Sequence, residues 1–261
     1  MSASADGGLL TVGAKDRVLA IGLNRPAKRN ALNDAMMMQF RDALETIPEG
    51  IGAVVLHGVG DHFSAGLDLS ELSERDATEG LQHSQMWHRV FDRIQYCRVP
   101  VIAALRGAVI GGGLEMACAA HIRVAEPSAY YALPEGQRGI FVGGGGSVRL
   151  PRLIGVDRMM DMMLTGRVYS ATEGAAFGFS QYITEEGNAL AKAMELGARV
   201  AQNAPLTNFA VLQALPMIAE ANPQTGLLME SLMATVAQSD KEAKKRIRDF
   251  LDRKTAKVKP T

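Results

Sequence analysis

With 261 residues, 47% of them hydrophobic, and 28 Lys and Arg balanced by 28 Asp and Glu, the chain has an ordinary globular composition. That excludes extensive disorder and gives no reason to expect a nucleic-acid partner. Two cysteines are too few for a disulfide framework, no apolar run reaches the length of a membrane span, and the first residues carry no basic–apolar signal, so we expect a soluble cytoplasmic protein with no membrane partner.

The first part of the chain predicts an α/β arrangement. Apolar stretches at 9–12 and 18–23 indicate a β-hairpin. Asn33 is placed to cap a helix over 34–47, whose methionines favour core packing over a cofactor site. The continuous apolar run 51–56 indicates a strand buried on both faces, and a glycine-containing loop follows it.

A helix is expected over residues 82–96, where apolar side chains recur at helical spacing. Trp87 and His88 lie beside this apolar stripe. We interpret both as packing or surface residues, with a lid over a site as the alternative.

The central segment, residues 106–154, contains three glycine clusters, and two of its three glutamates, Glu115 and Glu135, lie within two residues of a glycine. A strand at 101–105, a glycine turn and a helix at 114–120 place Glu115 in the first helical turn, where free backbone amides gather. Residues 121–125 and 130–133 have the pattern of a short hairpin, and Glu135 follows them.

These two carboxyl groups beside backbone donors indicate an acid/base site. The residue types alone leave a structural alternative open. In that alternative Glu115 complements the positive end of its helix and Glu135 is a solvated loop residue.

The segments that end near Leu67 and Gly112 resemble each other, since each has an apolar strand, a glycine turn and then exposed amides. Their spacing, 112 − 67 = 45 residues, is compatible with a repeated ββα unit. Two such turns, stacked side by side, would point two amides into one space, which is the arrangement of an oxyanion hole.

The second half of the chain predicts a change from mixed structure to helices. Before residue 204 we expect helices at 148–154, 157–164, 173–177 (capped by Ser170) and 188–201, with a strand at 181–184. Beyond it we expect helices at 207–220, 225–238 and 241–252. We therefore divide the chain into an α/β core, 1–204, and a helical C-terminal region, 205–261. The basic residues of the last helix favour a solvated face, with phosphate binding as the alternative.

Several common sequence signatures are missing. The chain contains no GxxxxGK[ST], GxGxxG, HExxH, CxxC or GxSxG motif, and its histidines show no metal-ligand spacing. An acid/base enzyme without a metal or a separate cofactor is compatible with this pattern.

The chain resembles the enoyl-CoA hydratase/isomerase (crotonase) superfamily over nearly its full length. Five segments carry the resemblance, and their order and spacing together are specific. They are NRPAKRNALN at 24–33, FSAGLDL at 63–69, GGGLE at 111–115, LPE at 133–135 with the glycines after it, and Arg149-Leu150.

The resemblance implies a spiral of ββα turns and an acyl-CoA thioester substrate. It implies that the backbone amides of Leu67 and Gly112 hold the thioester carbonyl, that Glu115 and Glu135 act as acid and base on a water, and that Gly143 helps to position that water. Coenzyme A would be part of the substrate rather than a cofactor.

The resemblance also implies contacts to coenzyme A. Arg29 and Ala31 would lie near its nucleotide end, and Ala65, Asp68 and Leu69 along the thioester. Phe250 and Arg253 would reach the coenzyme A of a neighbouring subunit in a homotrimer or homohexamer that the helical C-terminal region assembles.

Some positions depart from the family pattern. Leu67 replaces a small residue, His121 stands where Asp is usual, Val142 stands where Pro often occurs, and Gln137-Arg138 are more polar than the usual aliphatic pair. We expect these changes to affect the acyl group or the reaction rather than the fold.

Three functions remain open. The two glutamates favour an enoyl-CoA hydratase. The alternatives are a double-bond isomerase or another reaction of the superfamily, for which one carboxylate can suffice, and an acyl-CoA-binding protein without catalysis.

Overall fold

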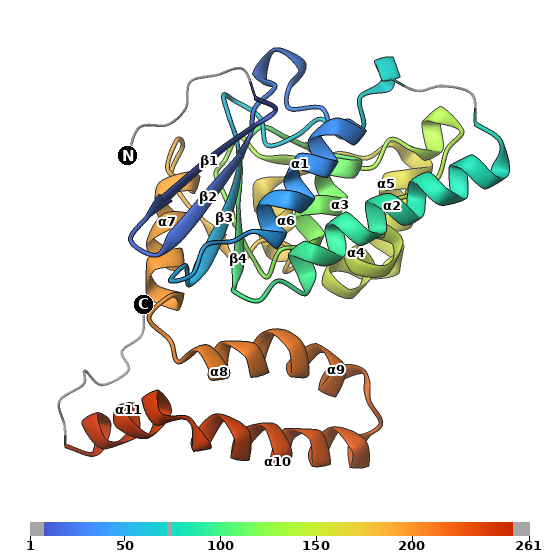
Figure 1. The fold of residues 1–261 in the computed structure, drawn as a ribbon. Helices are drawn as coiled ribbons and strands as arrows, with labels where there is room; N and C mark the ends of the chain where they lie inside the picture. Colours follow the sequence, from blue (N-terminus) through green and yellow to red (C-terminus); the bar gives the residue numbers. More distant parts are fainter. Residues whose placement is uncertain (1–7, 72–74, 253–261) are drawn as a thin grey trace. The chain divides into compact units, whose positions relative to one another are not determined.

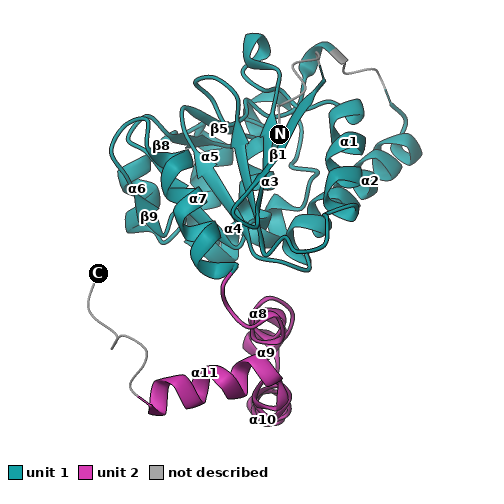
Figure 2. Ribbon diagram, turned by 60° about the vertical axis from the view of Figure 1, so that its left-hand side comes forward, with its two compact units in different colours: residues 1–201 teal, residues 202–261 magenta. Residues whose placement is uncertain are grey.

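The structure is a computed structural model that describes residues 8–71 and 75–252. The chain forms two compact units, residues 1–201 and residues 202–261 (Figure 2). This division lies close to the predicted boundary between residues 204 and 205.

A six-stranded sheet forms the centre of the larger unit (Figure 1). In spatial order its strands are β1 (Leu10–Lys15), β2 (Val18–Leu23), β3 (Ala53–Gly58), β4 (Val101–Leu105), β6 (Ile122–Ala125) and β9 (Tyr182–Ile183). The predicted hairpin is confirmed, because β1 and β2 pair antiparallel, whereas the other neighbours pair parallel.

Helices cover both faces of this sheet. Strand β3 is buried on both faces, as predicted: Val54 and Leu56 pack into one core, and Ala53 and Val55 pack into the other. The first core is closed by α1 (Asp34–Glu45), α2 (Ala77–Gln95) and α3 (Gly112–Ala119), and the second by α7 (Ala189–Val200). The expected cap of α1 is present, since the Asn33 side chain accepts a hydrogen bond from the Met36 amide.

A second, smaller sheet contains β5 (Ala108–Ile110), β7 (Tyr130–Ala132) and β8 (Tyr169–Ser170). The predicted hairpin of residues 121–125 and 130–133 is therefore wrong, since β6 belongs to the large sheet and β7 to the small one. Each of these strands pairs in parallel with a strand of the preceding turn, β6 with β4 and β7 with β5. Single parallel bridges, Leu32 to Leu67 and Ser64 to Val109, extend the small sheet to the earlier turns. This stacking produces the expected spiral of ββα turns.

The remaining helices of the larger unit lie where the sequence predicts them. They are α4 (Gly146–Ile154), α5 (Val156–Thr165) and α6 (Ala171–Ala176). Ser170 caps α6 in a reciprocal arrangement with Glu173. Both cysteines, Cys97 and Cys118, are free and buried.

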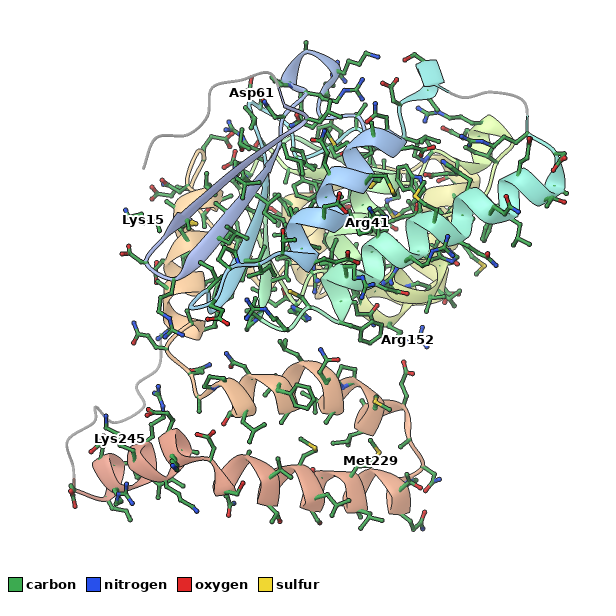
Figure 3. The ribbon with its side chains drawn as sticks, viewed as in Figure 1. Lys15, Arg41, Asp61, Arg152, Met229 and Lys245 are labelled. Carbon is green, nitrogen blue, oxygen red and sulfur yellow. The ribbon has the colours of Figure 1, made fainter. Side chains whose placement is uncertain are left out.

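The smaller unit is helical, as predicted. A continuous helical stretch comprises α8 (Pro205–Phe209), a π-helical turn (Ala210–Ala214) and α9 (Leu215–Glu220), and it is followed by α10 (Pro223–Ser239) and α11 (Lys241–Leu251). Figure 3 shows the side chains of this unit, with Met229 labelled on α10 and Lys245 on α11. None of the helices within the described ranges is long and apolar enough to cross a membrane.

Candidate active site

The N-terminus of α3 carries the first candidate residue. Strand β5 ends at Ile110, and Gly111 takes a φ of 51°, which a residue with a side chain rarely adopts, to turn the chain into the helix. A Cβ atom at Gly113 would lie 2.7 Å from Ser64, so glycine also allows α3 to approach the neighbouring turn. All residues of α3 are buried, and Glu115 lies in its first turn as predicted.

The Glu115 carboxylate is only 4% exposed and is held by the glycine loop that precedes α4. Its Oε1 accepts hydrogen bonds from the amides of Gly144 (2.9 Å) and Gly146 (2.8 Å). Burial raises the pKa of Glu115 above its ordinary value, and the backbone donors offset part of that rise because they stabilise the ionised form.

Glu135 is 8% exposed and begins the 3₁₀ turn Gly136–Arg138. Its Oε2 has no hydrogen-bond partner among the described residues. Burial, together with the nearby Glu115 charge, raises the pKa of Glu135 to about 7. A Cβ atom at Gly111 would lie 2.7 Å from its Oε1, which places this carboxyl group against the start of α3.

Two backbone amides approach each other beside these carboxyl groups. A Cβ atom at Gly112 would lie 3.6 Å from the Leu67 amide nitrogen, and one at Gly66 would lie 3.2 Å from the Gly112 amide nitrogen. Within the described ranges, neither the Leu67 amide nor the Gly112 amide has a hydrogen-bond acceptor. Two neighbouring free amides of this kind can both donate hydrogen bonds to one oxygen atom of a ligand.

All these groups line one cavity of about 390 Å³. From the set predicted to be catalytic, Leu67, Gly112, Glu115, Glu135 and Gly143 line it, and from the set predicted to bind coenzyme A, Ala65 and Leu69 line it. The cavity can therefore present two amide donors and two carboxyl groups, in different environments, to a single small molecule.

Known proteins share this architecture. A model of the enoyl-CoA hydratase/isomerase family matches residues 13–260. The chain belongs to that family. It is 34% identical to the 2,3-dehydroadipyl-CoA hydratase of Escherichia coli K12, with 96% of this chain and 98% of that protein aligned. It is 30% identical to the short-chain-enoyl-CoA hydratase of Clostridium acetobutylicum, over 91% and 92% of the two chains.

Crystal structures confirm the fold expected for the family. A Rhodopseudomonas palustris CGA009 protein, described only provisionally as an enoyl-CoA hydratase, is 79% identical and superposes with a TM-score of 0.93 over 99% of this chain and all of its own. The enoyl-CoA hydratase of Bacillus anthracis is 30% identical, with a TM-score of 0.88 over 94% and 97% of the two chains. The crotonase fold is thus shown for this family member.

Three residues of the predicted coenzyme A set lie outside the cavity wall. Arg29 is exposed and the Ala31 carbonyl accepts a hydrogen bond from Arg25. The Asp68 carboxylate lies 2.7 Å from the Arg25 guanidinium and 2.9 Å from the Lys28 ammonium. Asp68 therefore connects two loops of the protein, and its carboxylate is already neutralised.

The C-terminal members of that set, Phe250 and Arg253, fall within residues 202–261. Phe250 is an exposed residue of α11. Arg253 lies outside the described residues.

Sequence patterns did not single out several residues of the cavity wall. Trp87 is buried, which confirms the packing interpretation, and it also lines the cavity beside His83. Its indole Nε1 donates to Asp34 Oδ1 (3.1 Å), and His83 Nε2 contacts the same oxygen at 2.8 Å. The i, i+4 spacing of His83 and Trp87 indicates that these two side chains lie on one face of a helix. Their shared contact with Asp34 could not be predicted, because Asp34 belongs to a distant segment of the chain.

The departures from the family pattern fall into two groups. His121 is not among the cavity residues: its Nδ1 accepts from the Val101 amide (2.9 Å) and its Nε2 donates to the Gln95 carbonyl (3.0 Å). It therefore connects α2 to β4. By contrast, Leu67, Val142 and Arg138 all line the cavity, where they can affect which acyl group fits.

Proposed function

We propose that this family member is an enoyl-CoA hydratase, which adds water across the 2,3 double bond of a 2-enoyl-CoA thioester. The observation that carries the proposal is the presence of both Glu115 and Glu135 in the cavity that also contains the free amides of Leu67 and Gly112. Addition of water needs one group to accept a proton and another to supply one.

The two amides have the role of an oxyanion hole in this proposal. The thioester oxygen accepts hydrogen bonds from Leu67 and Gly112, and these bonds strengthen as negative charge develops on the oxygen. Loss of one such donor raises a barrier by roughly 3 kcal/mol.

The environments of the two carboxyl groups suggest how they divide the proton transfers. Glu115, which accepts two amide hydrogen bonds, is ionised and takes a proton from water as the water oxygen bonds to C3. Glu135, whose pKa is raised to about 7, is protonated and gives its proton to C2. One water O–H bond, the Glu135 O–H bond and the C2–C3 π bond break, and C3–O, C2–H and Glu115 O–H bonds form. Exchange of protons with solvent then restores both carboxyl groups.

The substrate brings its own coenzyme A, and no separate cofactor takes part in this scheme. Ala65 and Leu69 are proposed to lie along the thioester, with Gly143 near the attacking water. Arg29 and Ala31 are proposed to lie near the nucleotide end of coenzyme A, and Asp68 is proposed to fix the loop that runs along the thioester. Phe250 and Arg253 are proposed to contact the coenzyme A of a neighbouring subunit.

Turnover of crotonyl-CoA tests the proposal, because hydration removes the absorbance of the conjugated enoyl thioester. We expect this absorbance to fall in proportion to protein concentration. Absence of hydration with short, long and aromatic 2-enoyl-CoA substrates would contradict the proposal, and double-bond migration in place of hydration would indicate an isomerase.

A further inference from the structure

Arg138 lies on the cavity wall, on the same side of its turn as Glu135. The Arg138 amide donates to the Glu135 carbonyl at 3.0 Å, and Glu135 itself has helical dihedral angles. Side chains three residues apart eclipse each other in a 3₁₀ turn. Both side chains line the same cavity, so Arg138 extends the wall beyond the reacting carboxyl groups.

Among the described residues the Arg138 side chain makes no hydrogen bond or salt bridge, although its charge acts on nearby Glu135 and lowers the pKa of that carboxyl group in part. The other arginine of the described cavity wall, Arg75, lies 3.9 Å from Asp34. A guanidinium at a cavity wall whose donors are not taken by a carboxylate of the protein can accept an anionic group from a ligand.

Apolar residues that follow Arg138 in the chain line the same cavity. Gly139, with a φ of 71°, ends the 3₁₀ turn. Ile140 and Phe141 come next, and both line the cavity although they are 44% and 70% exposed. Ile140 and Phe141 can therefore contact the methylene groups of a ligand, and Arg138 can bind an anionic group at its end.

We propose that the preferred acyl group is an enoyl chain that ends in a carboxylate, and that Arg138 binds that carboxylate. This inference rests on the proposed hydratase function and specifies its substrate class. Arg138 has no part in the proton transfers; it selects and orients the far end of the acyl chain.

A matched pair of substrates tests the inference: two six-carbon 2-enoyl-CoA thioesters, one ending in a methyl group and one in a carboxylate. We expect the wild-type protein to show a higher kcat/KM for the carboxylate-ended substrate. In R138Q the ratio of the two kcat/KM values should fall about 10-fold, as expected for the loss of a charge-assisted hydrogen bond. R138K, which keeps the charge, should retain most of the preference.

Arg89 provides the matched control, because it is an exposed arginine of α2 that does not line the cavity. The ratio should be the same in R89Q as in the wild-type protein.

Three results would overturn the inference. The wild-type protein could show no preference for the carboxylate. R138Q could lower kcat/KM equally for both substrates with a higher KM, which would assign Arg138 to a phosphate of coenzyme A. R138Q could lower kcat equally for both, which would assign Arg138 to the charge balance of Glu135. If neither substrate gains water, the hydratase proposal itself fails, and this outcome is distinct from the other three.

Discussion

Two glutamates in one cavity differ because their hydrogen-bond partners differ. Glu115 Oε1 is fixed by two backbone amides, whereas Glu135 Oε2 is buried without a partner among the described residues. Both carboxyl groups are desolvated, which raises the pKa of each, but only Glu115 has backbone donors from the glycine loop to stabilise its charge. The same residue type can therefore supply a base at one position and an acid at the other.

We predict that E115Q and E135Q each lower kcat by about 100-fold or more, the effect of removing general acid or base catalysis. Glutamine keeps the size of each side chain, so circular dichroism spectra and thermal unfolding should stay close to those of the wild-type protein. Steady-state kinetics with crotonyl-CoA measures the change. Near wild-type turnover in either variant would remove that residue from the mechanism.

The raised pKa of Glu135 predicts a pH dependence. Below pH 7 Glu135 carries the proton that it is proposed to give to C2, and a rise in pH through about 7 removes that proton. We therefore expect kcat/KM to fall on the alkaline side, with an apparent pKa near 7. Stopped-flow rates from pH 5 to 9 measure this limb, and the residual activity of E135Q should lack it. A rate that stays constant from pH 6 to 9 would disprove the assignment of Glu135 as the acid.

At the scale of the elements, Asp68 connects two loops that approach the cavity. Its carboxylate accepts a hydrogen bond from the Ser70 hydroxyl (2.6 Å) and pairs with Lys28 and Arg25, and these partners hold its pKa far below the usual range. The Lys28 side chain is half exposed, so solvent screens part of its contribution. The loop that contains Leu67 is thereby fixed to the loop before α1.

We predict that D68N lowers the free energy of unfolding by about 1–2 kcal/mol at pH 7, a loss in the range of charged hydrogen bonds. Because the folded pKa is lowered, the stabilisation is complete above the ordinary Asp pKa of about 3.9 and is lost as the pH falls below it. Urea unfolding should thus show a constant difference from pH 8 to 5.5 and a smaller one near pH 3.5. D61N, at an exposed aspartate, is the control and should change stability little. An equal difference at every pH would contradict this role.

Local signals predicted most of these elements, and non-local contacts explain the errors. The Asn33 cap and the spacing of apolar residues define α1 within its own segment. The false hairpin of 121–125 and 130–133 arose because two short strands near each other in sequence look like a hairpin, whereas here they pair with earlier turns in different sheets.

The site was predictable only in part for the same reason. The family resemblance indicated both glutamates and both amides, and the structure brings them to one cavity. The contact of His83 with Asp34 spans 49 residues, and no local pattern encodes it. The bonds of His121 to Val101 and Gln95 likewise depend on the packing of α2 beside β4.

At the scale of the whole molecule, the smaller unit exposes large apolar side chains, including those of Leu227, Leu228, Leu232 and Met217. Exposed apolar surface of this extent is typical of a protein interface. We propose that it assembles the chain into a homotrimer or homohexamer, as the family resemblance implies.

Sedimentation equilibrium tests this proposal and should give three or six chain masses for the wild-type protein. Leu228 on α10 is 61% exposed, so L228E should shift the mass toward the monomer by placing a charge in the interface. E230Q, at an exposed polar residue of the same helix, should not change it. A wild-type protein that sediments as a monomer would contradict the assembly.

The most direct test of the central claim is mass spectrometry of the products formed from a panel of 2-enoyl-CoA thioesters. The panel should include methyl-ended, carboxylate-ended and aromatic acyl groups, each incubated with the wild-type protein and with E115Q. We expect at least one thioester to gain the mass of one water with the wild-type protein and to do so much more slowly with E115Q. Unchanged mass for every thioester, or equal gain of water with both proteins, would contradict the account.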